Sequence, residues 1–394
     1  MEELRVLHVA SFAGNIGDNA NHSGARSHLA VNFPGVAIRY TELEIRRFYR
    51  KWGELSFDDD FVTLANGYDL LMIGGGNYFE LWVEHSRTGT TVDLPPELLE
   101  TLTTPTVFYG LGLDPEKGYS ESTCARFRTF LDYVLEHDRF LVSVRNDGSL
   151  GHATRLFGAK YADRIHSIPD GGFFTVVEDQ NHPELAGAGK TLAVNLAGDM
   201  LDRRFDAKLK NGISADEFLK GYVAIIEGLL ADYPDLCLVL IPHISQDYTM
   251  ISALLDGMDD RLCRTRVKVA PLLRGESGQA CIFDLYRKSD LVMGNRFHTN
   301  VCAIGLGIPS IGLVNYPKIS ALYDEIGMPD RAVIITRQGF EERINALARE
   351  ALENPYPIKA RYHSICKELE QTLDAFHGHM RSWLAGIRGR GSDL

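Results

Sequence analysis

The chain has 394 residues, which is enough for two domains of ordinary size and too long for one compact core. Its 45% hydrophobic and 24% charged residues are typical of a soluble globular protein. The formal net charge of −12 argues against a nucleic-acid partner, which would require a basic face. The six scattered cysteines form no C-x-x-C pair, so the sequence predicts neither a zinc ribbon nor a disulfide framework.

Short apolar runs alternate along the chain with longer segments of helical period, a pattern that predicts parallel sheets covered by helices. We therefore expect an α/β protein with two Rossmann-like domains that face a cleft, at residues 1–180 and 190–355. Six strands are expected in the first half, at 4–11, 36–40, 68–73, 106–111, 140–145 and 165–168. Six more are expected in the second, at 192–196, 237–242, 267–270, 291–293, 310–314 and 332–335.

Three further segments complete the predicted organisation. Residues 178–190 are rich in Gly, Ala, Asn and Pro and form a natural linker. Ser214-Ala-Asp-Glu217 is a capping box, which predicts the start of a helix. The C-terminal segment, 356–394, contains an expected helix at 360–386 with an apolar stripe along one side. We expect this helix to pack back on the first domain, and pairing of two subunits into a homo-oligomer is the alternative.

The sequence contains no apolar run near the roughly 20 residues needed to cross a bilayer. It begins without the charged lead and cleavage site of a signal peptide. We therefore expect a cytoplasmic protein. The tail at 381–390 carries Trp383, Leu384 and Ile387, which could touch the inner face of the membrane.

The loop after the first expected strand is Phe12-Ala-Gly-Asn-Ile-Gly-Asp-Asn19, and a helix follows it. Its glycines permit a tight turn, and the following helix N-terminus favours an anion or a polar ligand. Asn15 and Asp18 are therefore candidate substrate-binding residues. An ordinary turn capped by Asp18 or Asn19 is an equally good interpretation.

Another expected strand ends in three glycines followed by an asparagine, in Ile73-Gly-Gly-Gly-Asn77. Consecutive glycines after a buried strand indicate that something approaches the backbone closely, either a ligand or the facing domain. Gly75, Gly76 and Asn77 are therefore candidate substrate-binding residues.

Two charged residues end the last two strands expected in the first half. Arg145 follows a very apolar strand, and a guanidinium at the mouth of a cleft suits recognition of phosphate or carboxylate. A surface ion pair with Asp147 is its alternative role. Asp170 could accept a hydrogen bond from a sugar hydroxyl, although its Pro-Asp-Gly context is explained equally well by a turn.

The most informative segment is Asp290-Leu-Val-Met-Gly-Asn-Arg-Phe-His-Thr299, in which a strand gives way to a helix. Arg296 and His298 fall in the first turn of that helix, where a cation opposes the helix dipole unless an anion binds beside it. Histidine is also the side chain best suited to proton transfer near neutral pH. Lys318, after the next strand, is either a third cation for the same anion or a solvated lysine.

Common catalytic motifs are missing from the sequence. It contains no H-E-x-x-H, Walker loop or G-x-S-x-G elbow, which removes the usual hydrolase and NTPase interpretations. The acidic run at 58–60 fits the D-x-D pattern of metal-dependent glycosyl transfer, but it lies in a polar loop and not at a strand end. We expect no metal site.

Taken in order, these motifs resemble the polysaccharide pyruvyl transferase family over about residues 6 to 330. Gly14-Asn-Ile-Gly-Asp18 resembles the family's opening G-N-x-G-D loop, and Arg296-Phe-His298 resembles its C-terminal R-x-H motif. Inner motifs of the family are similar to Gly74-Gly-Gly76, Tyr109-Gly-Leu-Gly112, Ser143-Val-Arg145, Gly307-Ile-Pro309 and Lys318.

This resemblance implies a glycosyltransferase-B-like fold and an enzyme of cell-surface or exopolysaccharide biosynthesis. It implies that phosphoenolpyruvate donates a pyruvyl group, as a co-substrate with no further cofactor, and that the product is a cyclic ketal on a sugar. The acceptor could be nucleotide-linked, lipid-linked or polymeric. By the same resemblance, the family's catalytic positions map onto Arg145, Arg296 and His298.

Two rival functions remain open at this point. A nucleotide-sugar-dependent glycosyltransferase of the same fold often carries two spaced glutamates in its C-terminal half, where this chain offers Asp324-Glu325. A non-catalytic sugar-binding protein that kept the fold is the second rival.

Overall fold

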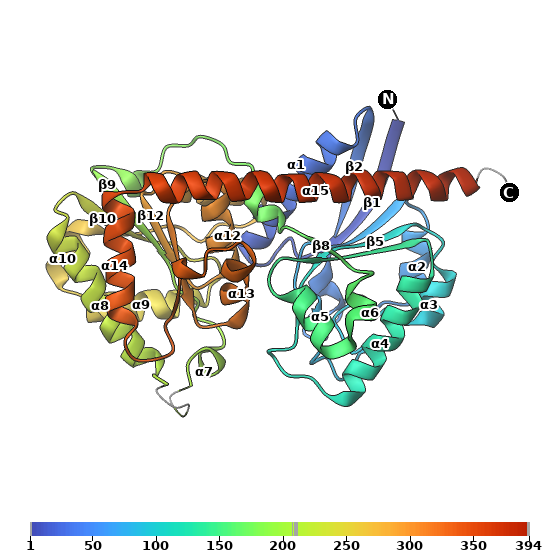
Figure 1. Ribbon diagram of the computed structural model, residues 1–394, viewed down its shortest axis with the longest axis horizontal. Helices are drawn as coiled ribbons and strands as arrows, with labels where there is room; N and C mark the ends of the chain where they lie inside the picture. The colour runs from blue at the N-terminus through green and yellow to red at the C-terminus, as the bar shows by residue number, and fades with distance from the viewer. Residues whose placement is uncertain (1, 207, 209–211, 392–394) are drawn as a thin grey trace. The chain divides into compact units, whose positions relative to one another are not determined.

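The computed structural model describes residues 2–206, 208 and 212–391, and the chain forms two compact units (Figure 1). The first unit contains the residues up to Ala13, Ala25–Asp170 and the residues from Glu368 onward. The second contains Gly14–Gly24 and Gly171–Lys367. The predicted domains are contiguous in sequence, whereas these units exchange segments. Gly14–Gly24 groups with the second unit, because Ile16 and Ala20 are part of that unit's core.

The first unit is built on a six-stranded parallel sheet with the order β2-β1-β3-β5-β7-β8. Its central strands form because nearly every side chain is apolar and buried on both faces, as expected for a parallel sheet. All six strands predicted in the first half are confirmed. Their bounds are β1 (Glu2–Ala10), β2 (Val36–Glu44), β3 (Leu70–Gly74), β5 (Thr106–Leu111), β7 (Phe140–Arg145) and β8 (His166–Ile168).

A second, two-stranded sheet in this unit pairs β4 (Phe79–Glu80) with β6 (Leu113–Asp114). This sheet could not be predicted from the sequence, because two residues are too few to show a period. Aromatic side chains fill the core beside it, with the ring centroids of Phe79 and Phe127 4.9 Å apart. The helices of this unit are η1 (Ile45–Phe48), α2 (Asp59–Ala65), α3 (Pro96–Thr101), α4 (Glu121–Glu136), α5 (Ser149–Phe157) and α6 (Ala159–Ala162).

The second unit contains a parallel sheet with the order β11-β10-β9-β12-β13-β14. Numbered along the chain, this is the 3-2-1-4-5-6 order of a Rossmann sheet, and its order reverses between β9 and β12. Ligands bind such sheets beyond the carboxyl ends of the strands at this reversal. The strands, all predicted, are β9 (Lys190–Asn195), β10 (Leu236–Leu240), β11 (Val267–Val269), β12 (Leu291–Gly294), β13 (Ser310–Val314) and β14 (Ala332–Ile334).

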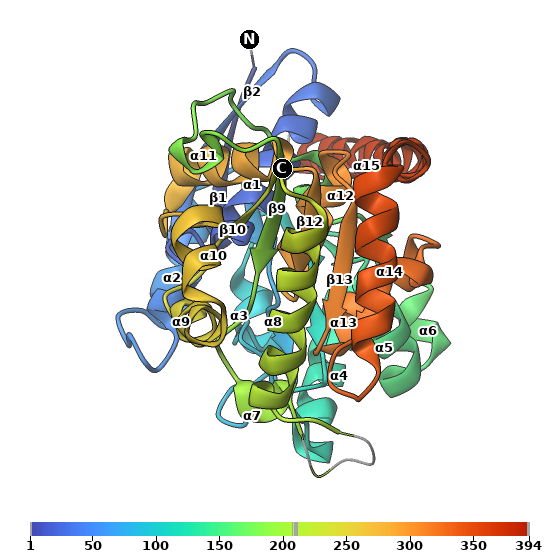
Figure 2. The same cartoon turned by 90° about the vertical axis from the view of Figure 1, so that its left-hand side faces the viewer.

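Helices cover the second sheet, and α8 and α14 lie side by side (Figure 2). The predicted capping box starts α8, where Ser214 and Glu217 bond to each other's backbone. The bounds are η2 (Gly171–Phe174), η3 (Pro183–Leu185), α7 (Leu201–Arg204), α8 (Ala215–Asp232), α9 (Asp247–Gly257), α10 (Asp260–Arg266), α11 (Gly275–Arg287), α12 (Phe297–Gly305), α13 (Pro317–Glu325), η4 (Pro329–Arg331) and α14 (Phe340–Glu353). Helix α1 (Ile16–Asn32) has residues in both units.

The long C-terminal helix α15 (Tyr356–Gly391) is visible in Figure 1, and its residues from Glu368 on belong to the first unit. There, His377 Nε2 lies 2.8 Å from Tyr109 Oη. The predicted return of this helix to the first domain is confirmed.

Two of the three tail side chains proposed for membrane contact, Trp383 and Leu384, make contacts or are buried within the first unit. Trp383 Nε1 donates to the Asp138 carbonyl at 2.6 Å, and Leu384 is buried. These two side chains therefore do not form an apolar face open to a membrane. Within the described residues, no helix is both long and apolar enough to span a bilayer.

Candidate functional site

The predicted site residues lie at the carboxyl ends of the two sheets and fall into two groups. Each group belongs to one compact unit. The first unit holds Gly75, Gly76, Asn77, Arg145 and Asp170, and the second holds Asn15, Asp18, Arg296, His298 and Lys318. The loop that carries Asn15 and Asp18 was expected on the acceptor side in the N-terminal domain, but it lies in the unit that carries His298.

Arg145 sits between two buried carboxylates at the ends of β7 and β8. Its Nε donates to Asp147 Oδ2 at 2.7 Å, and its Nη1 donates to Asp170 Oδ2 at 3.3 Å. Only 2% of the arginine is exposed, so the predicted pair with Asp147 exists but is not a surface pair. Asp170 therefore has a defined electrostatic partner.

Asn77 connects the end of β3 to the small β4–β6 sheet. Its Nδ2 donates to Glu80 Oε1 at 2.9 Å and to Asp114 Oδ2 at 3.0 Å. Its Oδ1 is buried and has no hydrogen-bond partner within the described residues. A Cβ atom placed on Gly112 would overlap this oxygen and lie 3.1 Å from Arg145 Nη2, so Asn77 and Arg145 are neighbours.

The three glycines after β3 meet backbone and side chains of their own unit. A Cβ atom on Gly74 would overlap the Tyr109 carbonyl oxygen, and one on Gly76 would lie 2.6 Å from Tyr78 Cε1. Gly75 has φ +77°, in the left-handed region that favours glycine. The close approach predicted from the sequence is therefore made by other residues of the same unit. Binding of substrate by Gly75 and Gly76 stays a prediction.

In the second unit, Arg296 is the N-cap of α12 and is only 8% exposed. Its Nε donates to Asp247 Oδ2 at 2.9 Å, and its Nη2 donates to Asp247 Oδ1 and, at 2.6 Å, to Asp199 Oδ1. Asp247 is fully buried and also accepts the backbone N–H of His243 at 2.8 Å. Burial by itself would raise the pKa of Asp247, but hydrogen bonding to Arg296 and its charge lower that pKa from its usual value.

A second arginine, Arg204 of α7, also lies beside the carboxylate of Asp199. Its Nη2 lies 3.5 Å from Asp199 Oδ2, and its Nη1 donates to Asn315 Oδ1 at 3.2 Å. Four members of this cluster were not predicted from the sequence: Asp199, Arg204, Asp247 and Asn315. Asp199, Asp247 and Asn315 follow strands β9, β10 and β13, so the strand-end criterion that selected Arg296 would have found them.

His298 is the second residue of α12 and lies against the first turn of α1. Its Nδ1 is 4.0 Å from Asp18 Oδ1, and the side chains of both residues are largely buried. Asn15 Oδ1 accepts the Gly17 N–H at 2.8 Å, which holds the turn in shape. The predicted candidates Asn15, Asp18 and His298 are thus brought together in one unit.

Gly17, in the first turn of α1, is the residue that lets this turn approach His298 so closely. A Cβ atom on Gly17 would lie 2.6 Å from His298 Nδ1. We expect Gly17→Ala to lower the free energy of unfolding by about 1–3 kcal/mol, as overpacking does. Gly228→Ala is a matched control, because Gly228 lies within helix α8 and a Cβ atom there would contact no atom beyond the backbone of its own helix. This variant should be neutral or stabilising. Urea denaturation measures both, and equal stability of the two variants would contradict this account of Gly17.

Lys318 lies at the start of α13, after strand β13. Its Nζ is 5.7 Å from the ring centroid of Phe297 and 5.6 Å from that of Tyr316. Phe297 is the residue between Arg296 and His298, so the lysine lies close to the R-x-H motif. Its role as a third cation for an anion stays a prediction.

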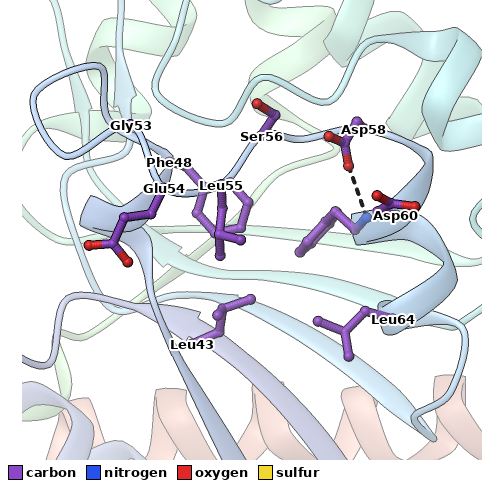
Figure 3. Close-up of a pocket in the computed structure, with 10 residues that line it drawn as sticks. Leu43, Phe48, Gly53, Glu54, Leu55, Ser56, Asp58, Asp60 and Leu64 are labelled. Carbon is purple, nitrogen blue, oxygen red and sulfur yellow. Dashed lines mark hydrogen bonds between the residues drawn. The ribbon is translucent and has the colours of Figure 1, made fainter.

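A separate cavity of about 380 Å³ lies in the first unit, between η1 and α2 (Figure 3). Apolar side chains, among them Leu43, Phe48 and Leu64, line it together with Asp58 and Asp60. It contains no predicted site residue. Asp58 Oδ1 accepts the Phe61 N–H at 3.1 Å as the N-cap of α2. This acidic run starts a helix, and the described residues contain no cluster of acidic, histidine or cysteine side chains that could hold a metal ion.

A model of the polysaccharide pyruvyl transferase family matches residues 15–316, which is more than half of the chain. The chain belongs to this family. The match begins in the loop that carries Asn15 and Asp18, and it includes the R-x-H motif at the start of α12. No curated protein matches the sequence significantly.

Solved structures with the same fold show low sequence identity to this pyruvyl transferase family member. A UDP-N-acetylglucosamine 2-epimerase is 14% identical with a TM-score of 0.55, over 92% of this chain and 91% of its own. The S. aureus MnaA–UDP complex is 10% identical with a TM-score of 0.53, over 91% and 90%. The UDP-GlcNAc 2-epimerase of Methanocaldococcus jannaschii is 10% identical with a TM-score of 0.51, over 89% and 93%. The predicted glycosyltransferase-B-like fold is confirmed.

Proposed function

We propose that this member of the family transfers the pyruvyl group of phosphoenolpyruvate to two hydroxyl groups of one sugar, forming a cyclic ketal and releasing phosphate. Membership of the family supports pyruvyl transfer onto a polysaccharide or its precursor. The observation that carries the proposal further is the contact of His298 with Asp18 beside Arg296. A histidine and a buried arginine at the end of strand β12 support the proposal, because they are the side chains that acid–base catalysis and anion binding require.

The donor carries a carboxylate and a phosphate, so its binding requires fixed cations in a site where water is partly excluded. Arg296 and the N-terminus of α12 are the candidates for one of these groups, with Lys318 assisting. Arg145, which forms ion pairs with Asp147 and Asp170 in the first unit, stays a candidate for substrate binding by the family resemblance. No metal or organic cofactor is needed in this proposal, because the guanidinium groups supply the positive charge.

His298 would act as the general acid. It protonates the methylene carbon C3 of the donor while a sugar hydroxyl attacks C2, so the C2–C3 double bond becomes a single bond to a methyl group. A second hydroxyl of the same sugar then replaces the phosphate at C2, and phosphate leaves with the C–O bonding electrons. Asp18 is the candidate that orients the ring of His298 or accepts a proton from the acceptor.

The acceptor is a sugar that is nucleotide-linked, lipid-linked or polymeric. A cytoplasmic location belongs to the same proposal, since phosphoenolpyruvate is made in the cytoplasm. Assembly into a homo-oligomer is an alternative that the size of the particle in solution would test.

Binding of phosphoenolpyruvate is the first test. We expect phosphoenolpyruvate to raise the Tm of the wild-type protein, because a ligand that binds only the folded state stabilises it. Arg296→Lys keeps the charge but loses the bidentate geometry, and it should abolish most of that shift. Arg264→Lys is the control, because Arg264 pairs with Asp260 on the exposed surface.

Each outcome of this test separates the proposal from its rival. A Tm shift that Arg296→Lys removes and Arg264→Lys preserves would support a donor site at Arg296. A shift with a uridine nucleotide and none with phosphoenolpyruvate would favour a nucleotide-sugar-dependent glycosyltransferase.

A further inference from the structure

The carboxylate of Asp199 lies between two arginines in the second unit. It accepts a hydrogen bond from Arg296 at 2.6 Å and lies 3.5 Å from Arg204. Both arginines are less than 9% exposed, whereas the Asp199 side chain is 27% exposed. Burial by itself would raise the pKa of Asp199, but the charges of Arg296 and Arg204 lower it from its usual value, so this carboxyl is an anion.

Two asparagines next to this cluster carry buried hydrogen-bond donors: Asn315 contacts Arg204, and Asn295 precedes Arg296 in the chain. Asn315 Oδ1 accepts a hydrogen bond from Arg204 Nη1, and Asn295 Oδ1 accepts one from the Ala197 N–H at 2.6 Å. The Nδ2 atoms of both asparagines are buried and have no partner within the described residues. Buried donors are rarely left without an acceptor. These two Nδ2 atoms, together with the two guanidinium groups, indicate a place for a ligand with several acceptor oxygens.

The other carboxylate of the cluster, Asp247, is a permanent partner of Arg296. It is fully buried and accepts the backbone N–H groups of Gly198, His243 and Ile244 as well. Asp199, by contrast, is partly exposed. The next residue, Met200, has φ +53° and is the one non-glycine residue in the described part of the chain with positive φ. Such strain clusters at functional sites.

We infer that Arg204 and Arg296 form an anion site for the phosphate group of the donor, and that the Asp199 carboxylate occupies this site until the donor replaces it. The inference rests on the proposed function and adds Arg204, Asn295 and Asn315 to the donor site. Displacement requires only that the partly exposed Asp199 side chain rotate away, while Asp247 keeps Arg296 in place. Two arginines and two amide donors suit a phosphate dianion better than a carboxylate with two oxygens.

This inference makes a prediction opposite in sign to that of a permanent structural ion pair. If Asp199 competes with the ligand, Asp199→Asn removes the competitor and should tighten the binding of inorganic phosphate about fivefold, the order expected for a partly exposed ion pair. If Asp199 only positions the arginines, the same variant should bind phosphate more weakly. Arg204→Ala should weaken phosphate binding at least about tenfold, since it removes one of the two cations.

The test is isothermal titration of each full-length protein with inorganic phosphate at constant ionic strength. Asp202→Asn is the matched control, because Asp202 is exposed on the same short helix as Arg204 and the variant has the same net charge as Asp199→Asn. It should bind phosphate like the wild type. Thermal unfolding of each variant without phosphate shows that the protein remains folded.

Three results would overturn the inference. The first is a folded Asp199→Asn protein that binds phosphate no more tightly than the wild type. The others are an equal gain of phosphate affinity in Asp202→Asn and the absence of phosphate binding to any variant. Turnover of phosphoenolpyruvate tests the proposed function separately. Tighter phosphate binding by Asp199→Asn without any turnover would support the anion site and contradict pyruvyl transfer. Turnover of phosphoenolpyruvate, combined with an affinity for phosphate that Asp199→Asn leaves unchanged, would support pyruvyl transfer and contradict the anion site.

Discussion

His298→Ala should lower the single-turnover rate of phosphate release from phosphoenolpyruvate by about 10²- to 10⁴-fold, the usual contribution of general acid catalysis. The expected effect is large because C3 of the donor is a carbon atom, which water protonates poorly without a positioned acid. His298 is held at the start of α12, with its Nδ1 4.0 Å from Asp18 Oδ1. Donor affinity should change much less than the rate, because Arg296 supplies the charge for binding.

The control for this prediction is His363→Ala, because His363 is exposed on α15 and was not assigned to the site. It should leave the rate unchanged. A purely structural role for His298 would lower Tm and donor affinity together with the rate. Near-normal turnover by His298→Ala would remove it as the general acid, and rapid-quench measurement of phosphate decides between these outcomes.

Asp247→Ala should lower the free energy of unfolding by about 3–5 kcal/mol, the cost of leaving a buried charge without its partner. The variant would remove the fixed partner of Arg296, a guanidinium that is only 8% exposed. It would also leave the N–H groups of His243 and Ile244 without their acceptor. The large effect is therefore expected even though a solvent-exposed ion pair contributes little.

Urea denaturation of Asp247→Ala measures this loss. Asp256→Ala is its control, since Asp256 is exposed on the same helix, and it should change stability by less than about 0.5 kcal/mol. A loss below about 1 kcal/mol in Asp247→Ala would contradict the central role given to this carboxylate.

The pH dependence of stability provides a second measurement of the same ion pair. Burial opposes ionisation of Asp247, but the hydrogen bonds and charge of Arg296 outweigh this effect. They lower the pKa of Asp247 in the folded state. The carboxylate therefore stabilises the fold above the unfolded-state pKa of about 4. This stabilisation is lost as the pH falls through the lower folded-state pKa. The stability of Asp247→Asn should accordingly fall less steeply than that of the wild type below about pH 4.

The sequence alone predicted most of the architecture, because buried parallel strands are nearly continuous apolar runs. Every residue of β5 and of β13 is buried, for example, and the predicted bounds of both strands agree with the structure. Short β4 and β6 were missed because their two residues have no measurable period. The sequence also did not predict that Gly14–Gly24 belongs to the second unit, because this segment follows the first strand of the first unit directly in the chain.

The candidate site was predicted in part. Arg145, Arg296 and His298 were found because they follow strands in a recognisable order of motifs. Asp170 and Asp18 were predicted as substrate-binding candidates, but their distance in sequence concealed the side chains that they meet in the fold, Arg145 and His298. The carboxylate pair Asp199 and Asp247 around Arg296 was missed entirely.

The sequence by itself determined the α/β class, the order of the strands along the chain and the family, since these depend on apolar periodicity and on motifs read locally. Only the tertiary structure decided which charges compensate one another. Asp199, Asp247 and Arg296 are separated by 48 and 49 positions in sequence, and they meet because parallel strands bring their carboxyl ends to one edge of the sheet. An ion pair depends on distance and burial, and neither can be obtained from the spacing of residues along the chain.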